Sequence, residues 1–389
     1  MKRVVIIGGS YGGIRALETL SGEKVEVTLI DQHAYHYLQT ESYDLVASKK
    51  AIEETIIYLP SLVQGIDPHF TFVCDKAVAI ENNCVIGEKA KYNFDYLLVT
   101  VGAVTKFPEG FDQKSVHSFG VKSLQGSVKI KHFFETELLE RLEPLFSKKK
   151  FRIVIVGGGL SGVEIATEMQ HYFNRYMRRN ALSCGTIEII LVSRSLLNGF
   201  SPGVQQKVSG RLKHLGVKHL PHHVSNVAKD HAYLDNGESV TFDFIVYTGG
   251  IEPAPFISAL PYPKNEQGFL AVDEYLRLDD HIFAAGDCAV LYDHKGRIAP
   301  PTAQSAEQSA QIAAKNILSD IARHPLQKSV IKMNGIAIAL GGKHALIVTP
   351  FGFSFGGIFG FIVKKTIELS YKIPLRWKAQ RGYDAPCNH

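Results

Sequence analysis

The stretch RVVIIGGSYGG at residues 3–13 constrains the fold more than any other part of the chain. Its first half, Val4–Ile7, predicts a strand buried on both faces, and its glycines predict a turn that opens a helix over residues 14–20. Such a turn lets the backbone approach a dinucleotide's pyrophosphate, because glycines leave room and the helix N-terminus offers free N–H groups. The residues predicted to bind are Gly8, Gly9, Ser10, Gly12 and Gly13.

The second predicted strand, Val25–Ile30, ends in Asp31. An acid about twenty residues past the first glycine is placed to accept hydrogen bonds from a ribose hydroxyl. The match to G-x-G-x-x-G is incomplete, since Ser10 stands in place of the middle glycine. The first stretch alone therefore leaves two interpretations, a nucleotide site or a tight strand–helix turn in another α/β protein.

Residues 151–164, FRIVIVGGGLSGVE, repeat this pattern of strand, glycine turn and helix, here with all three glycines of G-x-G-x-x-G at Gly157, Gly159 and Gly162. Two such turns in one chain are much less expected by chance than one. The strand that follows, residues 186–192, ends in Ser193 and Arg194 instead of an acid. An acid would repel a 2′-phosphate, whereas a hydroxyl and a guanidinium accommodate one. NADPH is therefore expected beside NADH, unless Arg194 is only a solvated loop residue.

Length and composition bound the remaining possibilities. A chain of 389 residues exceeds the usual size of a single core, so two or three domains are expected. The formal charge of +5 is modest and implies no nucleic acid. Five cysteines without C-x-x-C spacing argue against disulfides or zinc, and no metal site is expected. The N-terminus reads as a strand, so no signal peptide is expected.

Three further strands end in small-residue turns that let a cofactor approach the backbone. The first turn carries Thr100 and Gly102, the second Gly250, and the third Gly286 and Asp287. An acid such as Asp287 can hydrogen-bond a polyol like the ribityl chain of a flavin, or it can simply cap a helix.

Helices are expected over residues 163–179 and 301–317, and Pro301 and Thr302 suit the start of the second. Asp235-Asn236-Gly237, between two alternating strands, predicts a hairpin.

The last fifty residues differ in character. Residues 345–363 carry no charge and are just long enough to span a bilayer, but Pro350 and four glycines make a poor spanning helix. From Ile358 onward, a helical projection gathers the charges on an arc of about 100° and leaves the rest mostly apolar. The charged residues on this arc are Lys364, Lys365, Glu368 and Lys372. After Pro374 come the basic residues Arg376, Lys378 and Arg381, together with Trp377. This arrangement suits an anionic membrane surface, with docking onto the protein's own core or a dimer partner as the alternative.

With both turns, the aspartate after IFAAG and the helix beginning PPTAQSAEQ, the chain resembles the type II NADH:quinone oxidoreductases over nearly its whole length. The most specific element is AQSAEQ at residues 303–308, which fits that family's A-Q-x-A-x-Q quinone-site pattern. The stretch FIVKKTIELSYKI at residues 361–373 resembles its membrane-facing helix. The resemblance implies a single-subunit, non-pumping flavoprotein of the α/β class, with two Rossmann-like dinucleotide-binding domains and a C-terminal amphipathic, membrane-anchoring helical region.

The resemblance also assigns roles to residues. The first turn with Asp31 would hold the ADP part of FAD, Thr100 and Gly102 would border the flavin, and Gly286 and Asp287 would lie along its ribityl chain. The second turn, with Ser193, Arg194 and Gly250, would seat NADH or NADPH. Glu164, Gln304 and Lys364 (or Lys365, if the alignment slips by one) are the implied catalytic residues, and Gln304, Gln308 and Ile367 would bind quinone. Hydride would pass from the nicotinamide to flavin N5, and electrons then to a membrane quinone.

The implied domains are an FAD-binding domain over residues 1–113 and 266–330, an NAD(P)H-binding domain over 114–265, and a quinone- and membrane-associated region over 331–389. The expected location is peripheral, on the cytoplasmic face of the cell membrane, and a homodimer is left open. Two alternatives remain. A sulfide:quinone oxidoreductase needs a cysteine pair that Cys184 and Cys288 do not supply, and a soluble, apoptosis-factor-like nucleotide sensor would not need the AQSAEQ helix.

Overall fold

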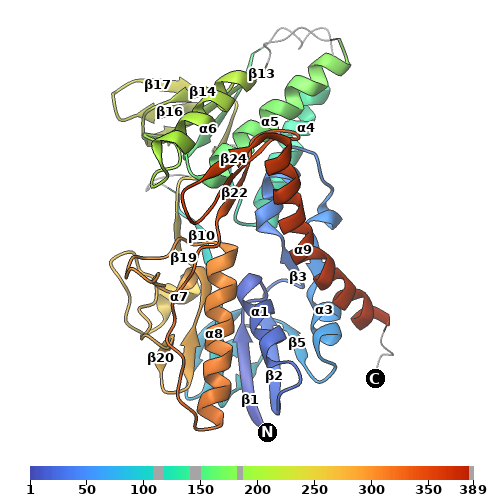
Figure 1. The fold of residues 1–389 in the computed structure, drawn as a ribbon, viewed down its shortest axis with the longest axis vertical. Helices are drawn as coiled ribbons and strands as arrows, with labels where there is room; N and C mark the ends of the chain where they lie inside the picture. Colours follow the sequence, from blue (N-terminus) through green and yellow to red (C-terminus); the bar gives the residue numbers. More distant parts are fainter. Residues whose placement is uncertain (108–117, 141–149, 182–186, 385–389) are drawn as a thin grey trace.

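The computed structural model describes residues 1–107, 118–140, 150–181 and 187–384, and two mainly parallel sheets organise it (Figure 1). The first sheet has the order β20-β21-β9-β1-β2-β5. Its strands are β1 (Lys2–Ile7), β2 (Val25–Asp31), β5 (Thr71–Cys74), β9 (Tyr96–Val99), β20 (Arg277–Asp279) and β21 (Ile282–Ala284). The chain leaves this sheet after β9 and returns to it with β21, which pairs with β9 in parallel.

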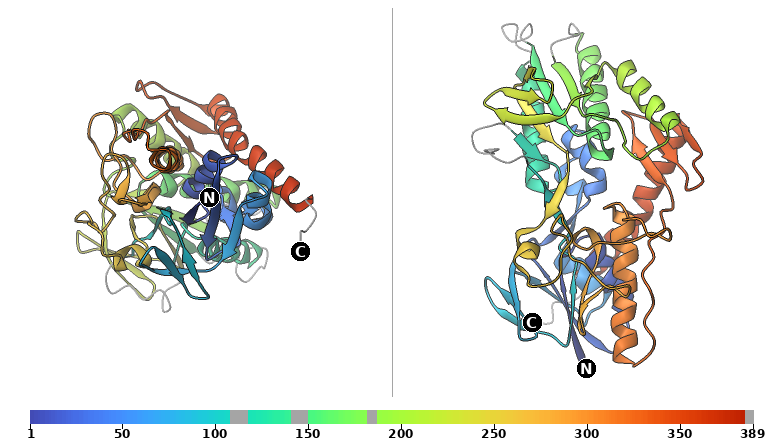
Figure 2. Two further views of the ribbon diagram at one scale, coloured as in Figure 1. Left: turned by 90° about the horizontal axis from the view of Figure 1, so that it is seen from below. Right: turned by 90° about the vertical axis from the view of Figure 1, so that its left-hand side faces the viewer.

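The second sheet has the order β11-β18-β12-β13-β14 and is parallel throughout. Its strands are β11 (Ser118–Gly120), β12 (Phe151–Val156), β13 (Ile187–Val192), β14 (Lys218–Leu220) and β18 (Phe244–Tyr247). Each sheet forms the centre of one lobe of an elongated molecule, as the side view in Figure 2 shows. The last four residues of each central strand, VVII in β1 and IVIV in β12, are buried, which explains why these runs are wholly apolar.

The helices cover these sheets as the sequence predicts. In the first lobe, α1 (Tyr11–Leu20) packs against α8 (Ala303–Ile321), and in the second, α5 (Leu160–Arg179) packs against α6 (Pro202–Leu215). The predicted helices at residues 14–20, 163–179 and 301–317 are confirmed within a few residues at their ends. Thr302 caps α8, because its hydroxyl accepts a hydrogen bond from the N–H of Ser305 at 3.2 Å.

Short elements connect the two lobes and decorate their edges. The remaining helices are α2 (Ser42–Val46), α3 (Leu59–Ile66), α4 (Leu124–Glu140) and α7 (Pro255–Ala259), with 3₁₀ turns at Gln39–Glu41, Ile52–Glu54 and Gly286–Cys288. The smaller sheets are β3 (Tyr35–Tyr37) with β4 (Ile56–Tyr58); β6 (Ala77–Glu81), β7 (Cys84–Gly87) and β8 (Lys91–Asn93); β10 (Ala103–Thr105) with β19 (Ile251–Pro253); β15 (Val224–Ala228), β16 (His231–Leu234) and β17 (Ser239–Thr241); and β22 (Ile336–Ala339), β23 (Ala345–Val348) and β24 (Ser354–Gly356).

The last helix, α9 (Gly357–Asp384), runs along the outside of the molecule from the second lobe to the first, beside α3 (Figure 1). Its backbone crosses α3 closely, since a Cβ on Gly65 would lie 1.7 Å from the carbonyl oxygen of Lys378. The helix continues through Pro374. The uncharged residues 345–363 divide between β23, β24 and the start of α9. Among the residues that the structure describes, no helix is both long enough and apolar enough to cross a membrane.

Candidate functional site

The first glycine turn lies at the carboxyl end of β1 and is fixed by close backbone contact. A Cβ on Gly13 would lie 1.9 Å from the carbonyl oxygen of Gly8, so no side chain fits there. The hydroxyl of Thr100 donates to that same oxygen at 2.9 Å. Asp31 accepts the N–H of Gly9 at 2.6 Å. Burial raises the pKa of the Asp31 carboxyl, and this N–H bond opposes the shift.

The surroundings of this turn fit a bound dinucleotide. Ser10 is the residue before α1, and its side chain makes no capping bond to the helix. Gly12 lies where α1 meets α8, with its Cβ position 3.5 Å from the carbonyl oxygen of Ala306. Gly102 has a φ of +68° and open space where a Cβ would stand. A flat ring system can therefore approach the backbone at this point.

Gly286 and Asp287 follow β21 at the edge of the same region. Gly286 has a φ of +78°, and its N–H donates to the hydroxyl of Ser309 in α8 at 3.0 Å. Asp287 forms an ion pair with Lys122 at 2.8 Å. Asp287 therefore lies near the start of α8 with Lys122 as its counter-ion. Its carboxylate can accept hydrogen bonds from both this ammonium group and a cofactor hydroxyl.

The second glycine turn is built in the same way. A Cβ on Gly162 would lie 1.9 Å from the carbonyl oxygen of Gly157, and the hydroxyl of Thr248 donates to that oxygen at 3.3 Å. Gly159 precedes α5 and has open space at its Cβ position. Gly250 has a φ of +151° and lies at the start of the segment leading into β19. As in α1, the first N–H groups of α5 have no carbonyl partner within the helix and are available to a bound anion.

The strand that ends in Ser193 and Arg194 borders a cavity of about 170 Å³ beside this turn. Arg194 is 70% exposed, but its Nε donates to a carboxylate oxygen of Asp235 at 3.1 Å. The other oxygen of Asp235 lies 3.2 Å from Nδ1 of His222, which also lines the cavity. Arg194 is therefore held by the β16–β17 hairpin. Sequence reasoning missed Asp235, whose only visible signal was its place in the predicted hairpin Asp235-Asn236-Gly237.

Glu164 and Lys364 meet across the molecule as a buried ion pair. They belong to α5 and α9, and the Lys364 ammonium lies 3.0 Å from the Glu164 carboxylate. Burial raises the pKa of Glu164, and the charge of Lys364 opposes that shift. Burial alone would lower the pKa of Lys364, but Glu164 and Glu368 raise it above its ordinary value. Lys364 therefore stays charged, and it is Lys364 instead of Lys365 that contacts Glu164.

Strand β22 and the residues before it collect the three implied catalytic side chains. The N–H of Ala339 donates to Glu164 at 2.9 Å, and Lys364 donates to the carbonyl of Ala337 at 3.1 Å. Just before β22, and two residues before Ala337, the carbonyl of Gly335 accepts a hydrogen bond from the Gln304 amide at 2.9 Å. Side chains from α5, α8 and α9 thus meet on one short backbone segment.

Gln304 and Gln308 of α8 both hydrogen-bond to backbone groups of the segment before β22. Gln304 also accepts the N–H of Asn334 at 3.0 Å, and Gln308 exchanges two hydrogen bonds with Lys332 at 2.7 and 2.9 Å. Glutamines exposed to solvent would bond water instead of backbone groups. Gln304 and Gln308 therefore fix the position of the segment that leads into β22. Ile367 is 53% exposed and is not among the side chains gathered there.

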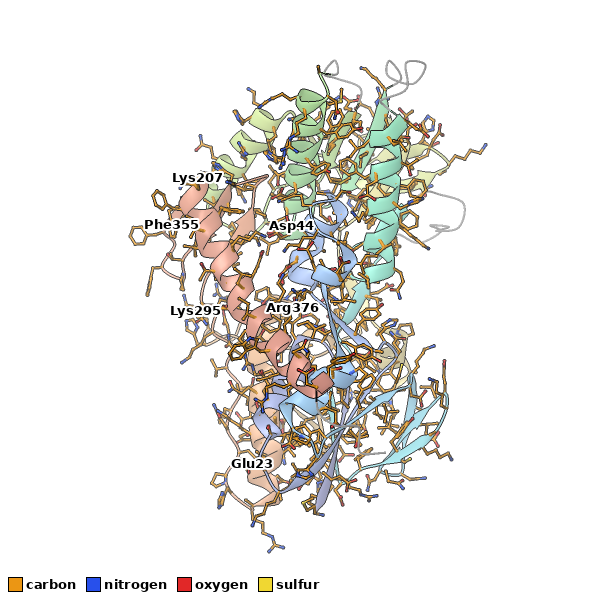
Figure 3. All side chains as sticks on the ribbon, turned by 90° about the vertical axis from the view of Figure 1, so that its right-hand side faces the viewer. Glu23, Asp44, Lys207, Lys295, Phe355 and Arg376 are labelled. Atoms are coloured by element: carbon orange, nitrogen blue, oxygen red, sulfur yellow. The ribbon has the colours of Figure 1, made fainter. Side chains whose placement is uncertain are left out.

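The charged arc predicted for α9 exists, but it faces the protein. Lys364, Glu368 and Lys372 are buried, whereas the apolar side of the helix is exposed. The exposed apolar residues on this side include Ile358, Phe359, Ile362, Ile367, Leu369, Ile373 and Trp377, preceded by Phe351, Phe353 and Phe355. Figure 3 shows Phe355 pointing away from the body of the molecule and Asp44 lying between α9 and the second lobe.

Two of the basic residues expected to meet a membrane are used within the protein, which corrects that part of the prediction. Lys378 pairs with Glu18, and Arg376 donates to the carbonyl oxygens of Glu53 and Glu54 at 3.0 and 3.1 Å. The charges of Lys378 and Arg376 therefore hold α9 on the first lobe. Their partners lie more than 300 residues away along the chain, so the local sequence of α9 did not reveal them.

Comparison with known proteins agrees with this geometry. Residues 2–313 match the family model described as pyridine nucleotide-disulphide oxidoreductase, and the chain belongs to that family. A probable NADH dehydrogenase of Dictyostelium discoideum is 26% identical over 98% of this chain and 88% of its own length. A type II NADH:quinone oxidoreductase of Haemophilus influenzae is 25% identical over 89% of this chain and 86% of its own length.

Among solved structures, NDH2 from Plasmodium falciparum in complex with NADH superposes with a TM-score of 0.85. It covers 98% of this chain and 97% of its own, at 17% identity. The two-lobed architecture and the added C-terminal region are therefore those of this fold.

Proposed function

We propose that this chain is an FAD-dependent, non-pumping NAD(P)H:quinone oxidoreductase that acts at a membrane surface. The observation that carries the proposal is the meeting of Glu164, Lys364 and Gln304 on the segment at β22. This segment joins α8, which packs on the helix of the first glycine turn, to α5, which begins at the second. The printed names of the two relatives described above support the same activity.

The first turn is proposed to hold FAD. Gly8, Gly9, Ser10, Gly12 and Gly13 would seat its pyrophosphate, with Asp31 at the ribose. Thr100 and Gly102 would border the ring system, and Gly286 and Asp287 its polyol chain. When bound, FAD supplies two-electron chemistry that no side chain provides. The start of α8 after Thr302 adds the positive end of a helix dipole for negative charge at the ring.

The second turn is proposed to hold the nicotinamide nucleotide. Gly157, Gly159 and Gly162 would receive its pyrophosphate, Gly250 would border it, and Ser193 and Arg194 would meet the adenosine ribose. Both NADH and NADPH are proposed as donors. Residues 1–113 with 266–330 and residues 114–265 would then be the two nucleotide-binding domains, with 331–389 as the quinone- and membrane-associated region.

Quinone is proposed to bind near Gln304, Gln308 and Ile367. The amide of Gln304 already bonds Asn334 and Gly335, so a quinone carbonyl would replace one of these bonds or add to the amide's second N–H. Glu164 and Lys364 would hold a proton and a fixed positive charge next to the reacting groups, because they are buried and paired.

The sulfide:quinone alternative is disfavoured by Cys288. Its thiol is fully buried, donates to the carbonyl of Ala285 at 3.2 Å, and burial raises its pKa to about 12. A thiolate needed to attack sulfur species would not form there. Cys184 lies outside the described residues.

Attachment to the cytoplasmic face of the membrane is proposed to use the exposed side of α9. Because Lys378 and Arg376 bond within the protein, the contact would be mainly apolar. The double variant Phe359→Ser and Ile362→Ser should therefore lower binding to lipid vesicles at least tenfold at high and low salt. Thr366→Ser, on the same exposed helix, serves as the control. A double variant that still sediments fully with vesicles would place the attachment elsewhere.

Deletion of α9 is a poorer test of attachment. It would remove Lys364, Lys365 and Lys372 from Glu164, Asp44 and Glu41, which are buried. Uncompensated buried carboxylates destabilise a fold by about 3–5 kcal/mol for each broken pair. Point substitutions on the outer face avoid this loss.

The activity itself is tested by steady-state turnover of NADH and NADPH with a short-chain quinone, while the flavin spectrum is recorded. We expect a yellow protein that releases FAD on heating and rapid quinone-dependent oxidation of at least one nucleotide. A colourless protein that FAD cannot reconstitute would contradict the proposal. Bound FAD without quinone-dependent turnover would favour the nucleotide-sensing alternative.

A further inference from the structure

A buried ionic network fills the interface between α2, α5 and α9. It joins five lysines to five carboxylates, so its charges balance, and six of the ten residues are buried. The members are Lys49, Lys50, Lys364, Lys365 and Lys372 with Glu41, Asp44, Glu164, Glu168 and Glu368. The resemblance implied Glu164 and Lys364 as site residues, but the sequence predicted none of these ion pairs.

The network leads away from Glu164 through a phenol. Lys364 lies 3.0 Å from Glu164 and 3.5 Å from the near oxygen of Glu368. Tyr43, which is 2% exposed, donates its hydroxyl to that same oxygen at 2.5 Å. The other oxygen of Glu368 lies 2.7 Å from the ammonium of Lys365. Glu368 is therefore the junction between the inner pair and the outer part of the network.

The outer part reaches water. The ammonium of Lys365 lies 3.3 Å from the Tyr43 hydroxyl and 2.8 Å from Asp44, and its side chain is 26% exposed. Asp44 continues to Lys49 at 2.7 Å, whose side chain is 24% exposed. No step along this route exceeds 3.5 Å, so hydrogen bonds and ion pairs together connect the surface to Glu164.

The proposed reaction needs such a connection. NAD(P)H, quinone and one proton give NAD(P)⁺ and quinol, so each turnover takes one proton from water. The hydride carries the other proton. The side chain of Lys364 is 9% exposed and that of Glu164 is 13% exposed, so little water reaches this pair directly and a route through the protein can supply the proton.

The geometry points to Tyr43, Glu368 and Lys365 as the route that brings this proton from solvent to the Glu164–Lys364 pair. A proton enters at Lys365, which Asp44 holds in place, moves through the Tyr43 hydroxyl to Glu368, and passes by way of Lys364 to Glu164. Each group returns to its starting charge, and one proton is moved in total. The inference rests on the proposed quinone reductase function, and these residues act through Glu164 without touching substrate.

Every charged group that faces the route belongs to the network or lies at its edge. Glu368 faces Tyr43 of α2 and Lys364 and Lys365 of its own helix. Asp44 faces Lys49, Lys50 and Lys365. Beyond them, Glu168 meets Lys49, and Arg211 and His171 stand outside that pair. Burial raises the pKa of Glu168 as it does that of Glu164, so both ends of the network can accept a proton.

Two conservative substitutions test the route. Tyr43→Phe removes the hydroxyl but keeps the ring on which the Lys364 ammonium lies, 4.8 Å from its centre. Lys365→Arg keeps the positive charge and its hydrogen bonds, but a guanidinium does not release its proton. Tyr37→Phe is the control, because it removes another buried hydroxyl, bonded to Ser127, outside the network.

The holoenzyme is mixed first with NAD(P)H and then, after reduction, with a short-chain quinone. The first half-reaction takes no proton from water, and the second takes one, which a pH-indicator dye records. We expect both variants to keep the first rate within twofold and to lose at least tenfold in the second, with matching delay of proton uptake. The loss should be larger at pH 8 than at pH 6 and should be relieved by added imidazole.

A purely structural network predicts a different result. Both half-reactions would then fall together with the melting temperature, or neither would change, and imidazole would have no effect. Either outcome overturns the route. Failure of NAD(P)H to reduce the wild-type protein would instead overturn the proposed function. Tyr37→Phe should match the wild type in both half-reactions.

Discussion

The two glycine turns share one construction and differ at one strand end. In each, a glycine of the helix lies against the carbonyl of the first glycine, and a threonine from a neighbouring strand bonds that carbonyl. In each, the first glycine donates to the end of the next strand, Gly8 to Ile30 at 2.8 Å and Gly157 to Val192 at 2.9 Å. The residue after that strand is Asp31 in the first turn and Ser193 in the second.

The two turns also differ in how far they are exposed to solvent. The first turn is enclosed, because α8 packs on Gly12 and Asp31 is largely buried against Gly9. The second opens to a cavity with the exposed Arg194 at its rim. An enclosed site suits a cofactor that stays bound, and an open site suits a nucleotide that exchanges at each turnover. In the proposed assignment the same strand–turn–helix backbone serves both roles, and the residue at the strand end and the helix that covers the turn distinguish them.

The largest expected effect comes from replacing the most closely packed glycine of each turn by alanine, because the two turns are proposed to bind different ligands. Gly13→Ala should abolish FAD binding, because a Cβ 1.9 Å from a backbone oxygen cannot be accommodated. Gly162→Ala should keep FAD and raise the KM for NAD(P)H about a hundredfold, or about 2.7 kcal/mol. Flavin content and steady-state kinetics measure the two effects. Gly210→Ala, where a Cβ meets open space, is the control, and a Gly13→Ala protein with full flavin would remove the assignment of the first turn.

Ser193→Asp should make the second turn resemble the first. The new carboxylate would stand beside the N–H of Gly158 as Asp31 stands beside Gly9, and it would repel a 2′-phosphate. The ratio of kcat/KM for NADPH over NADH should fall about a hundredfold, or about 2.7 kcal/mol. Ser225→Asp adds the same charge on an exposed strand and should change the ratio less than twofold. No change with Ser193→Asp would show that the adenosine ribose binds elsewhere.

Low pH should lower the free energy of unfolding through a buried histidine in the first lobe. His36 packs on Tyr11 at the first turn, with ring centres 4.8 Å apart, and burial lowers its pKa from 6.5 to about 3. As the pH falls below 6.5, the unfolded chain binds a proton that the folded chain does not, so stability is lost. The loss between pH 7 and pH 5 should be about 2 kcal/mol. Thermal or urea unfolding at both pH values measures it.

His36→Phe should remove most of this acid loss. Its cost at pH 7 should be small, because Nδ1 of His36 has no hydrogen-bond partner among the described residues and only Tyr371 bonds the other nitrogen. His69→Asn, at an exposed histidine, should keep the wild-type dependence on pH. An unchanged pH dependence in His36→Phe would mean that the histidine is protonated in the folded protein.

The smallest expected effect concerns Arg194. Arg194→Gln should lower kcat/KM for NADPH about tenfold, or about 1.4 kcal/mol, and leave NADH within twofold. The guanidinium is exposed, so its attraction for a phosphate is partly screened by water and salt. Titration with 2′,5′-ADP at two salt concentrations checks binding directly. Equal losses with both nucleotides would mean that Arg194 holds the hairpin of Asp235 and does not read the 2′-phosphate.

The sequence by itself determined the parts that depend on short-range patterns. Apolar runs followed by glycines predict β1, β12 and the helices after them, because buried parallel strands and tight turns leave local signatures. The capping residue Thr302 and the hairpin at Asn236 and Gly237 were predicted for the same reason. The charged arc of α9 was also correct as a periodicity.

The tertiary structure decided what those patterns face. Lys364 pairs with Glu164 across 200 residues, and Tyr43 meets Glu368 across 325, so no spacing within either segment signals the contact. The direction of α9 shows the physical reason. A charged face is normally solvated, but here carboxylates on α2 and α5 offset the cost of burying its lysines, and the apolar face is left exposed. That choice depends on partners far along the chain, which only the folded molecule brings together.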